Sequence, residues 1–175
     1  MLQNEERLRI LFLPAWYPSE VNLVAGVFIK EHAKAASLYN DIVVLYGYSD
    51  LSPDLWKLYR VSEDVEDGIR TIRVKYGGLP SYVKRLVFKN REEVKYPASS
   101  ADSNKLIKIL KRLLGIPLIM VGDLLYYWSL FATFRRLIKE GWKPDIIHAH
   151  VYSAGVPAVI LGKLYRIPRP ALLPS

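Results

Sequence analysis

Histidine is the residue of this chain with the clearest capacity for site chemistry. The chain has three histidines and no cysteine. His148 and His150 stand two apart in the apolar run Asp145–His150, which is typical of a buried strand. We expect their side chains to point to opposite faces, so that His150 serves a site at the strand end while His148 is structural. We expect His32, on the apolar face of a helix, to be a core histidine.

A second group of candidate residues lies in one loop near the N-terminus. Gly26 stands where this loop meets a helix. A glycine there lets the main chain approach a ligand, and the free N–H groups of the helix favour an anion; alternatively, the glycine serves only the turn. Trp16 and Tyr17 either stack on a sugar or base or pack the loop down. Both alternatives stay open for each of these residues.

Several common site motifs are absent from the sequence. There is no GxxxxGK[ST] phosphate loop, no GxGxxG dinucleotide fingerprint and no GxSxG nucleophile elbow. No pair of carboxylates or histidines has the spacing of a metal site. We therefore expect neither a metal nor an organic cofactor.

The elements that would position these residues begin with the apolar run Leu8–Leu13, which has the length of a buried strand. The loop Pro14–Gly26 follows, and a helix begins after it. Its expected buried face comprises Phe28, Ile29, His32, Ala36 and Tyr39. A buried strand that leads into a helix is the first unit of a doubly wound α/β domain, in which ligands bind at the carboxyl ends of the strands.

Two segments resemble a known family. The segment WYPSEVNLVAGVFIKEHAKA, residues 16–35, is similar to the opening of family 4 glycosyltransferases, which are retaining enzymes of GT-B fold. The segment PDIIHAHVYSAGVPAVILGKLYRIP, residues 144–168, is similar to the end of the same family's N-terminal domain. The resemblance implies a Rossmann-like, mainly parallel sheet with helices on both faces, the N-terminal half of a GT-B fold.

The resemblance also implies roles for particular residues. It makes His150 the catalytic candidate, close to the reacting sugar or the acceptor. It makes Ala25, Gly26 and Val27 the loop beside the donor diphosphate. The candidates for contact with the sugar or the acceptor are Trp16, Tyr17 and Tyr152.

The reaction that the resemblance implies is transfer of a sugar from a nucleotide-sugar donor to an acceptor hydroxyl, with retention and without a metal. The acceptor would be a sugar or a lipid-linked molecule. We expect residues 1–175 to form a single acceptor-side domain. The family continues past the position of Ser175 into a C-terminal, donor-binding domain, so we expect this chain to be inactive alone.

Charge suggests an alternative function. Residues 70–112 carry 12 basic and three acidic residues, which accounts for more than the formal net charge of +8. Such a band attracts phosphates, anionic lipid or nucleic acid, or is simply a solvated surface. The alternative is therefore a non-catalytic docking domain for an anionic lipid or a protein partner. No motif supports nucleic-acid binding, and we do not expect it.

The remaining segments complete the expected sheet. Strands are expected at Asp41–Gly47 and at Ile69–Tyr76, the latter after an Asp67–Gly68 turn, with part of a last strand at Ala171–Leu173. The most apolar stretch, Gly115–Phe134, is expected to form two buried helical pieces rather than a membrane span. The pieces would be broken near Pro117 and Gly122, and Asp123 would cap the second.

The sequence also carries expectations about location. The segment Met1–Arg9 is polar, and the apolar run after it is only a strand long, so no signal peptide is expected. The absence of cysteine is compatible with a reducing cytoplasm. Together with the basic band, this predicts a cytoplasmic protein with peripheral attachment to the inner face of a membrane as one option.

Overall fold

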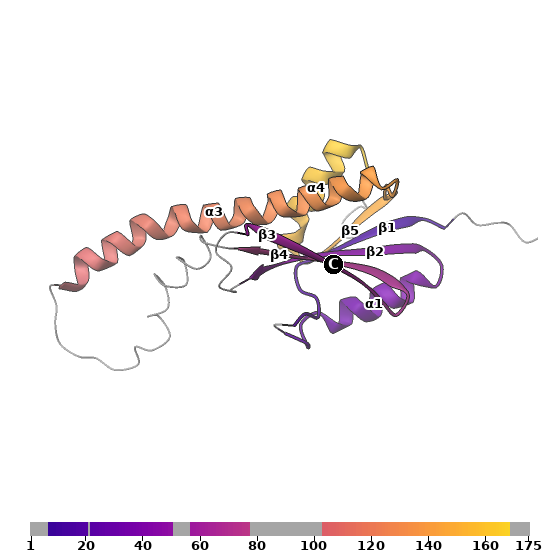
Figure 1. Cartoon of the computed structure of the whole chain (residues 1–175), viewed down its shortest axis with the longest axis horizontal. Coiled ribbons are helices and arrows are strands. Elements are labelled where there is room, and N and C mark those ends of the chain that lie inside the picture. The colour runs from indigo at the N-terminus through magenta and orange to yellow at the C-terminus, as the bar shows by residue number, and fades with distance from the viewer. Residues whose placement is uncertain (1–6, 21, 51–56, 78–102, 169–175) are drawn as a thin grey trace, which may run out of the picture. The chain divides into compact units, whose positions relative to one another are not determined.

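The computed structural model describes residues 7–20, 22–50, 57–77 and 103–168, with side chains except at 50, 103–116, 118, 119 and 152. These residues form an α/β structure with a five-stranded sheet, which confirms the expected class (Figure 1). The elements in chain order are β1 (Arg9–Pro14), α1 (Val27–Ser37), β2 (Asp41–Asp50), β3 (Tyr59–Glu66), β4 (Ile69–Gly77), α3 (Ser103–Lys139), β5 (Ile146–His150) and α4 (Tyr152–Tyr165).

The sheet has the strand order β3-β4-β2-β1-β5. Strand β1 lies between β2 and β5 and pairs in parallel with both. Helix α1 lies on one side of these three strands and α4 on the other (Figure 1). Consecutive residues Leu11, Phe12 and Leu13 are all at most 1% exposed, as expected for a parallel strand covered on both faces.

The turn predicted at Asp67–Gly68 is confirmed. It joins β3 to β4, and both of its residues have positive φ, 51° and 79°. Two central residues with positive φ match the right-handed twist of a hairpin, which is why an Asp-Gly pair is favoured there.

The predicted buried face of α1 is wrong in part. Its buried residues are Ile29 and Ala33, whereas Phe28 is 63% exposed and Tyr39, beyond the helix end, is 76% exposed. His32 is also exposed rather than a core residue. The two small or medium apolar side chains one turn apart bring α1 close to the sheet, and the bulkier Phe28 faces away.

The predicted break in the apolar stretch is also wrong. Helix α3 runs without interruption from Ser103 to Lys139, with Pro117, Gly122 and Asp123 all inside it. A proline within a helix removes one backbone hydrogen bond and bends the helix, and it does not always end it. Asp123 therefore does not cap a second helix.

Burial within α3 is uneven. Leu130, Phe134 and Leu137 are buried, as predicted for a core helix. Four apolar residues before them are exposed, which contradicts the expectation for that part; they are Met120, Val121, Leu124 and Trp128. Among the described helices, none combines the length and the apolar character that a bilayer crossing would need.

The C-terminal part of the chain completes the described elements. The last strand, Ala171–Leu173, lies outside the described residues. Helix α4 begins at Tyr152 without a side-chain cap. By its contacts the chain divides into two compact units, Met1–Gly47 with Val61–Val74 and Ser129–Ser175, and Tyr48–Arg60 with Lys75–Trp128. The site described next lies within the first unit.

Candidate functional site

Two segments far apart in the sequence meet at one edge of the sheet. In the parallel register of β1 and β5, Pro14 is the partner of His150. Directly beyond it, the Ala15 N–H donates a hydrogen bond to the His150 carbonyl, at 3.2 Å. The loop that starts at Ala15 and the histidine that ends β5 therefore share the carboxyl edge of the sheet, where the sequence predicted a site.

The loop's glycine has a structural requirement of its own. Gly26 has φ of 69° and immediately precedes α1. A Cβ built on it would lie 2.3 Å from the Trp16 carbonyl oxygen, so no other residue fits without movement of the backbone. The turn thus accounts for this glycine by itself. The approach of a ligand remains a prediction.

The backbone donors of this loop are partly used within it. The side-chain oxygen of Asn22 accepts hydrogen bonds from the N–H groups of Val24, at 3.1 Å, and Ala25, at 3.0 Å. Helix α1 has neither a side-chain cap nor an acidic residue in its first turn. Ala25 is therefore engaged inside the loop, whereas the beginning of α1, at Val27, carries no competing negative charge.

The two loop aromatics differ in exposure. Trp16 is 55% exposed, whereas Tyr17 is 1% exposed and packs against the ring of Tyr46. Burial raises the pKa of the Tyr17 hydroxyl, although a hydrogen bond with Thr71 partly opposes this rise. Tyr17 thus packs the loop down, which was one of its two alternatives. Trp16 retains a face that a ligand can reach.

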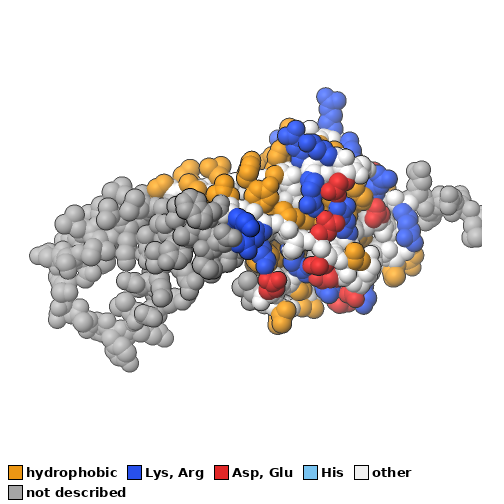
Figure 2. All heavy atoms as spheres, viewed as in Figure 1, with side chains coloured by type: hydrophobic (Ala, Val, Ile, Leu, Met, Phe, Trp, Pro, Cys, Tyr) orange, Lys and Arg blue, Asp and Glu red, His pale blue; other side chains and the backbone are white. Residues whose placement is uncertain are grey.

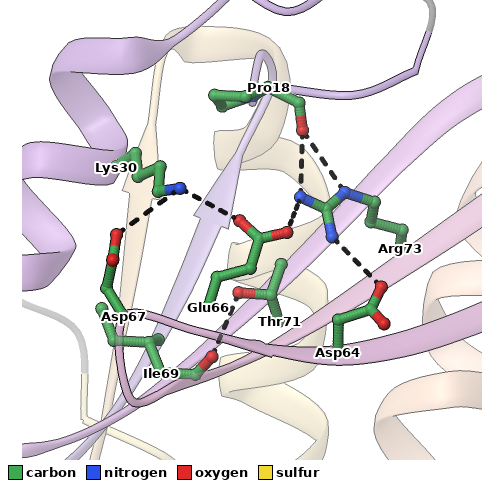
Figure 3. Close-up of polar contacts among 8 residues, drawn as sticks. All are labelled: Pro18, Lys30, Asp64, Glu66, Asp67, Ile69, Thr71 and Arg73. Atoms are coloured by element: carbon green, nitrogen blue, oxygen red, sulfur yellow. Dashed lines mark hydrogen bonds and ion pairs between the residues drawn. The ribbon is translucent and has the colours of Figure 1, made fainter.

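A network of charged residues holds the loop and α1 in place (Figure 3). The guanidinium of Arg73 donates two hydrogen bonds to the Pro18 carbonyl, at 3.2 and 3.3 Å, and pairs with Glu66. The ammonium group of Lys30, on α1, lies 3.3 Å from Glu66 and 3.5 Å from Asp67. The β3–β4 hairpin therefore holds the loop and α1 through side chains that were not among the candidate residues predicted from the sequence.

The predicted separation of His148 and His150 is wrong. Their rings stack at a centroid distance of 4.3 Å, on the same face of β5. Side chains alternate between the two faces of a strand, so residues two apart share a face. The spacing was therefore the signal for a cluster, and it was misinterpreted.

A third histidine joins them from α1. The ring centroid of His32 lies 5.4 Å from that of His148 and 5.3 Å from that of His150. The ring of Phe12, the register partner of His148, lies within 5.3 Å of all three. The three histidines of the chain thus gather over one apolar ring, an arrangement that the sequence analysis missed because it placed His32 in the core.

The environment of the two histidines on β5 favours their neutral form. Burial, together with the neighbouring His148 and His32, lowers the pKa of His150 to about 4. Burial and His32 lower the pKa of His148 as well. The Nε2 atom of His150 is buried and has no hydrogen-bond partner. At neutral pH β5 therefore offers two uncharged imidazoles, and that of His150 has a polar atom without a hydrogen-bond partner.

The backbone after His150 is strained. Val151 has φ of 73° and ψ of 147°, a region that branched side chains almost never adopt. The strain turns the chain sharply from β5 into α4, whose first residue is Tyr152. The side chain of Tyr152 lies outside the description. Strain of this kind is concentrated at functional sites, and here it adjoins the histidine cluster.

The described part of the basic band is already paired. Arg70 donates to Glu63 and, at 2.6 Å, to Glu140, while Arg73 serves the network described above. Lys75 lies over the ring of Tyr48. The band from 78 to 102 lies outside the described residues, as do the side chains from 103 to 112. The described basic residues of the band therefore do not form a surface of unpaired positive charges.

The site rests on three structural observations from this chain. These are the shared edge of β1 and β5, the fixed loop before α1 and the histidine cluster. A scan against models of protein families and a search of the curated proteins both gave no match to this chain.

Proposed function

We propose that this chain is the acceptor-side domain of a retaining, nucleotide-sugar-dependent glycosyltransferase of GT-B fold. The observation that carries the proposal is that the two resembling segments come together at one carboxyl edge, where Ala15, directly before the first segment, bonds to His150 of the second. Segments that form one site must converge in space, and these begin more than a hundred residues apart. Their likeness to one family and their convergence are independent observations.

The arrangement of the sheet supports the finer fold assignment. A central parallel strand with helices on both sides is the pattern of a doubly wound, Rossmann-like domain (Figure 1). In such domains the crevice beyond the carboxyl ends of the strands binds the ligand. The loop before α1 and the end of β5 border that position.

The proposed roles follow from the local chemistry. The beginning of α1, without a cap or an acidic residue, suits one oxygen of the donor diphosphate. His150, neutral at pH 7, would exchange hydrogen bonds with a sugar hydroxyl and position it rather than act as a strong acid. Trp16, exposed in the loop, would stack on a sugar face. Most contacts with the nucleotide would come from a donor-side domain.

The test is a donor and acceptor screen on a two-domain enzyme that carries this chain, with a chelator present throughout. His150→Ala should lower kcat/KM about a hundredfold, as loss of one positioned polar group does. His32→Ala removes a neighbouring imidazole from an exposed position and serves as the matched control, with an expected change of less than about threefold.

Two outcomes would contradict the proposal. One is the absence of transfer with every nucleotide sugar tested, and the other is an equal loss of rate in both variants. The chain alone should bind a nucleotide sugar only weakly, with a Kd of about 1 mM, because a GT-B site needs both walls. Turnover by the chain alone would show that the site is complete within these residues.

A second candidate function is docking to a membrane surface. Met120, Val121, Leu124 and Trp128 are exposed and fall within about 100° of arc on α3, given 3.6 residues per turn. Figure 2 shows hydrophobic side chains gathered over this helix. An apolar helix face of this kind enters the interface of a bilayer without crossing it.

Vesicle flotation tests this second function. Binding to neutral vesicles should be lost on Leu124→Glu, at the centre of the face, and kept on Lys139→Glu, an exposed change of charge at the end of the same helix. If anionic lipid contributes, binding should also weaken as salt rises, since exposed charges are screened beyond about 8 Å at physiological ionic strength. Equal binding by the Leu124→Glu variant would remove α3 as the docking face.

A further inference from the structure

We propose that His32, His148 and His150 bind a single divalent transition-metal ion of the zinc class. One ring nitrogen from each of the three lies within 4.8 Å of the others. Two come from the same face of β5 and the third from α1, the helix that covers that face. The site is therefore built from two regular elements of one compact unit.

The distances are close to those that such an ion requires. Zinc binds imidazole nitrogen at about 2.0–2.1 Å, so tetrahedral ligands stand about 3.4 Å apart. To reach this spacing from 4.8 Å, the rings must rotate so that the nitrogen–nitrogen distances shorten by about 1.5 Å. His32 is exposed on the helix surface, so its ring has space for that rotation.

An independent observation also indicates a missing partner. The Nε2 atom of His150 is buried and accepts or donates no hydrogen bond. Buried polar atoms without a partner are rare, and each one calls for an explanation. A metal ion at the centre of the three histidines would supply that partner, with the Phe12 ring as an apolar wall beside it.

The donor set narrows the class of ion. Three imidazoles suit zinc, copper, nickel or ferrous iron, whereas magnesium and calcium prefer oxygen ligands. Three protein ligands leave a fourth position open for water, as in zinc sites that bind a further ligand. The chain has three histidines and no cysteine, so all of its imidazole ligands are in this one cluster and it has no thiolate.

The inference does not rest on sugar transfer. The metal site and the proposed glycosyltransferase share His150, however, and one nitrogen cannot hold an ion and a sugar hydroxyl at the same time. A two-domain enzyme should therefore lose activity in stoichiometric zinc and recover it with chelator. If zinc did not inhibit the enzyme, the conclusion would be that His150 is not shared by the two sites. The binding experiment below tests the metal site by itself.

The binding experiment uses the 175-residue chain without a histidine tag, first stripped with chelator. Titration calorimetry with Zn²⁺ should give one ion per chain, and Co²⁺ should produce the visible absorption of a four-coordinate site. His32→Ala should weaken Zn²⁺ binding at least about a hundredfold, since even outer-sphere partners are worth ten- to a hundredfold. Glu31→Gln, the adjacent carboxylate on α1, should leave binding unchanged.

Two histidine variants that differ in how much they could disturb the fold are compared. His32 is exposed, so its replacement should leave the fold intact by circular dichroism; His148→Gln, at a partly buried position, should also weaken binding. The proposal is overturned if no ion binds the parent chain. It is also overturned if His32→Ala binds as tightly as the parent, or if Glu31→Gln loses as much as His32→Ala, because the ion would then lie on surface carboxylates.

Discussion

At the scale of single residues, His150 combines features that are rarely found together. It ends β5, the strand at one edge of the sheet, stacks on His148 and precedes a valine in a strained conformation. Its side chain is held neutral by burial, and its Nε2 atom has no partner. The strained backbone, the burial of the imidazole and the unpaired Nε2 atom each raise the free energy of the folded state, which is typical of a functional site.

The lowered pKa of His150 predicts how stability depends on pH. An unfolded histidine titrates near 6.5, whereas His150 in the folded chain titrates at about 4. Between these values the unfolded chain binds more protons, so stability falls as pH falls through this window. The side chain of His150 is only partly buried, and solvent screening reduces the effect of its pKa shift. The free energy of unfolding should therefore drop by about 1–2 kcal/mol from pH 7 to pH 5.

Urea unfolding at a series of pH values, with chelator present, measures this dependence. In His150→Gln the slope between pH 7 and pH 5 should be clearly shallower, because the neutral amide does not titrate. His148 contributes in the same direction, so some slope should remain. Identical slopes for the parent and the variant would mean that His150 is not held neutral by its surroundings.

At the scale of elements, the β3–β4 hairpin determines where the loop before α1 lies. Arg73 extends from β4 to the Pro18 carbonyl of the loop, and Lys30 of α1 meets Glu66 at the end of β3. The hairpin is thus bonded to both the loop and the helix that follow β1. A second group, Arg70, Glu63, Arg136 and Glu140, is more exposed and joins the hairpin to the end of α3.

These two groups predict unequal effects on stability. The Arg73 side chain is 11% exposed, and its loss would leave the Pro18 carbonyl and Glu66 with fewer partners. Arg73→Met should lower the free energy of unfolding by about 2–3 kcal/mol. Arg136→Met, the same change at a side chain that is 44% exposed, should cost less than about 1 kcal/mol.

Chemical denaturation of both variants checks this difference. If Arg136→Met destabilised the chain as much as Arg73→Met, the loop would not depend on the buried contact with Pro18. A further readout is limited proteolysis between residues 15 and 26, which should speed up in Arg73→Met alone.

At the scale of the whole molecule, the sequence predicted what is locally encoded. The apolar run of β1, the Asp-Gly hairpin and the end of β5 follow from patterns a few residues long. The Arg73–Pro18 contact joins residues 55 positions apart and has no local signal. Pro117 was misinterpreted because a local rule for helix ends did not hold within a long helix.

The candidate site follows the same division. Its place at the carboxyl edge, with Gly26 and His150, could be expected from strand and loop patterns. The cluster of three histidines could not be expected without the position of α1 on the sheet, because His32 is more than a hundred residues from the other two in the sequence. The histidine spacing on β5 was present in the sequence, and a correct use of the two-residue period would have paired His148 with His150.

The position of β1 between β2 and β5 has a consequence for the synthesis of the protein on the ribosome. One neighbour, β2, follows within a few tens of residues, but the other pairs Ile10 with Ile146, 136 positions later. At 5–20 residues per second, a ribosome needs on the order of ten seconds to deliver that partner. During this time one edge of an apolar strand is open to pairing with other chains. The nascent chain should therefore depend most on chaperones before β5 emerges.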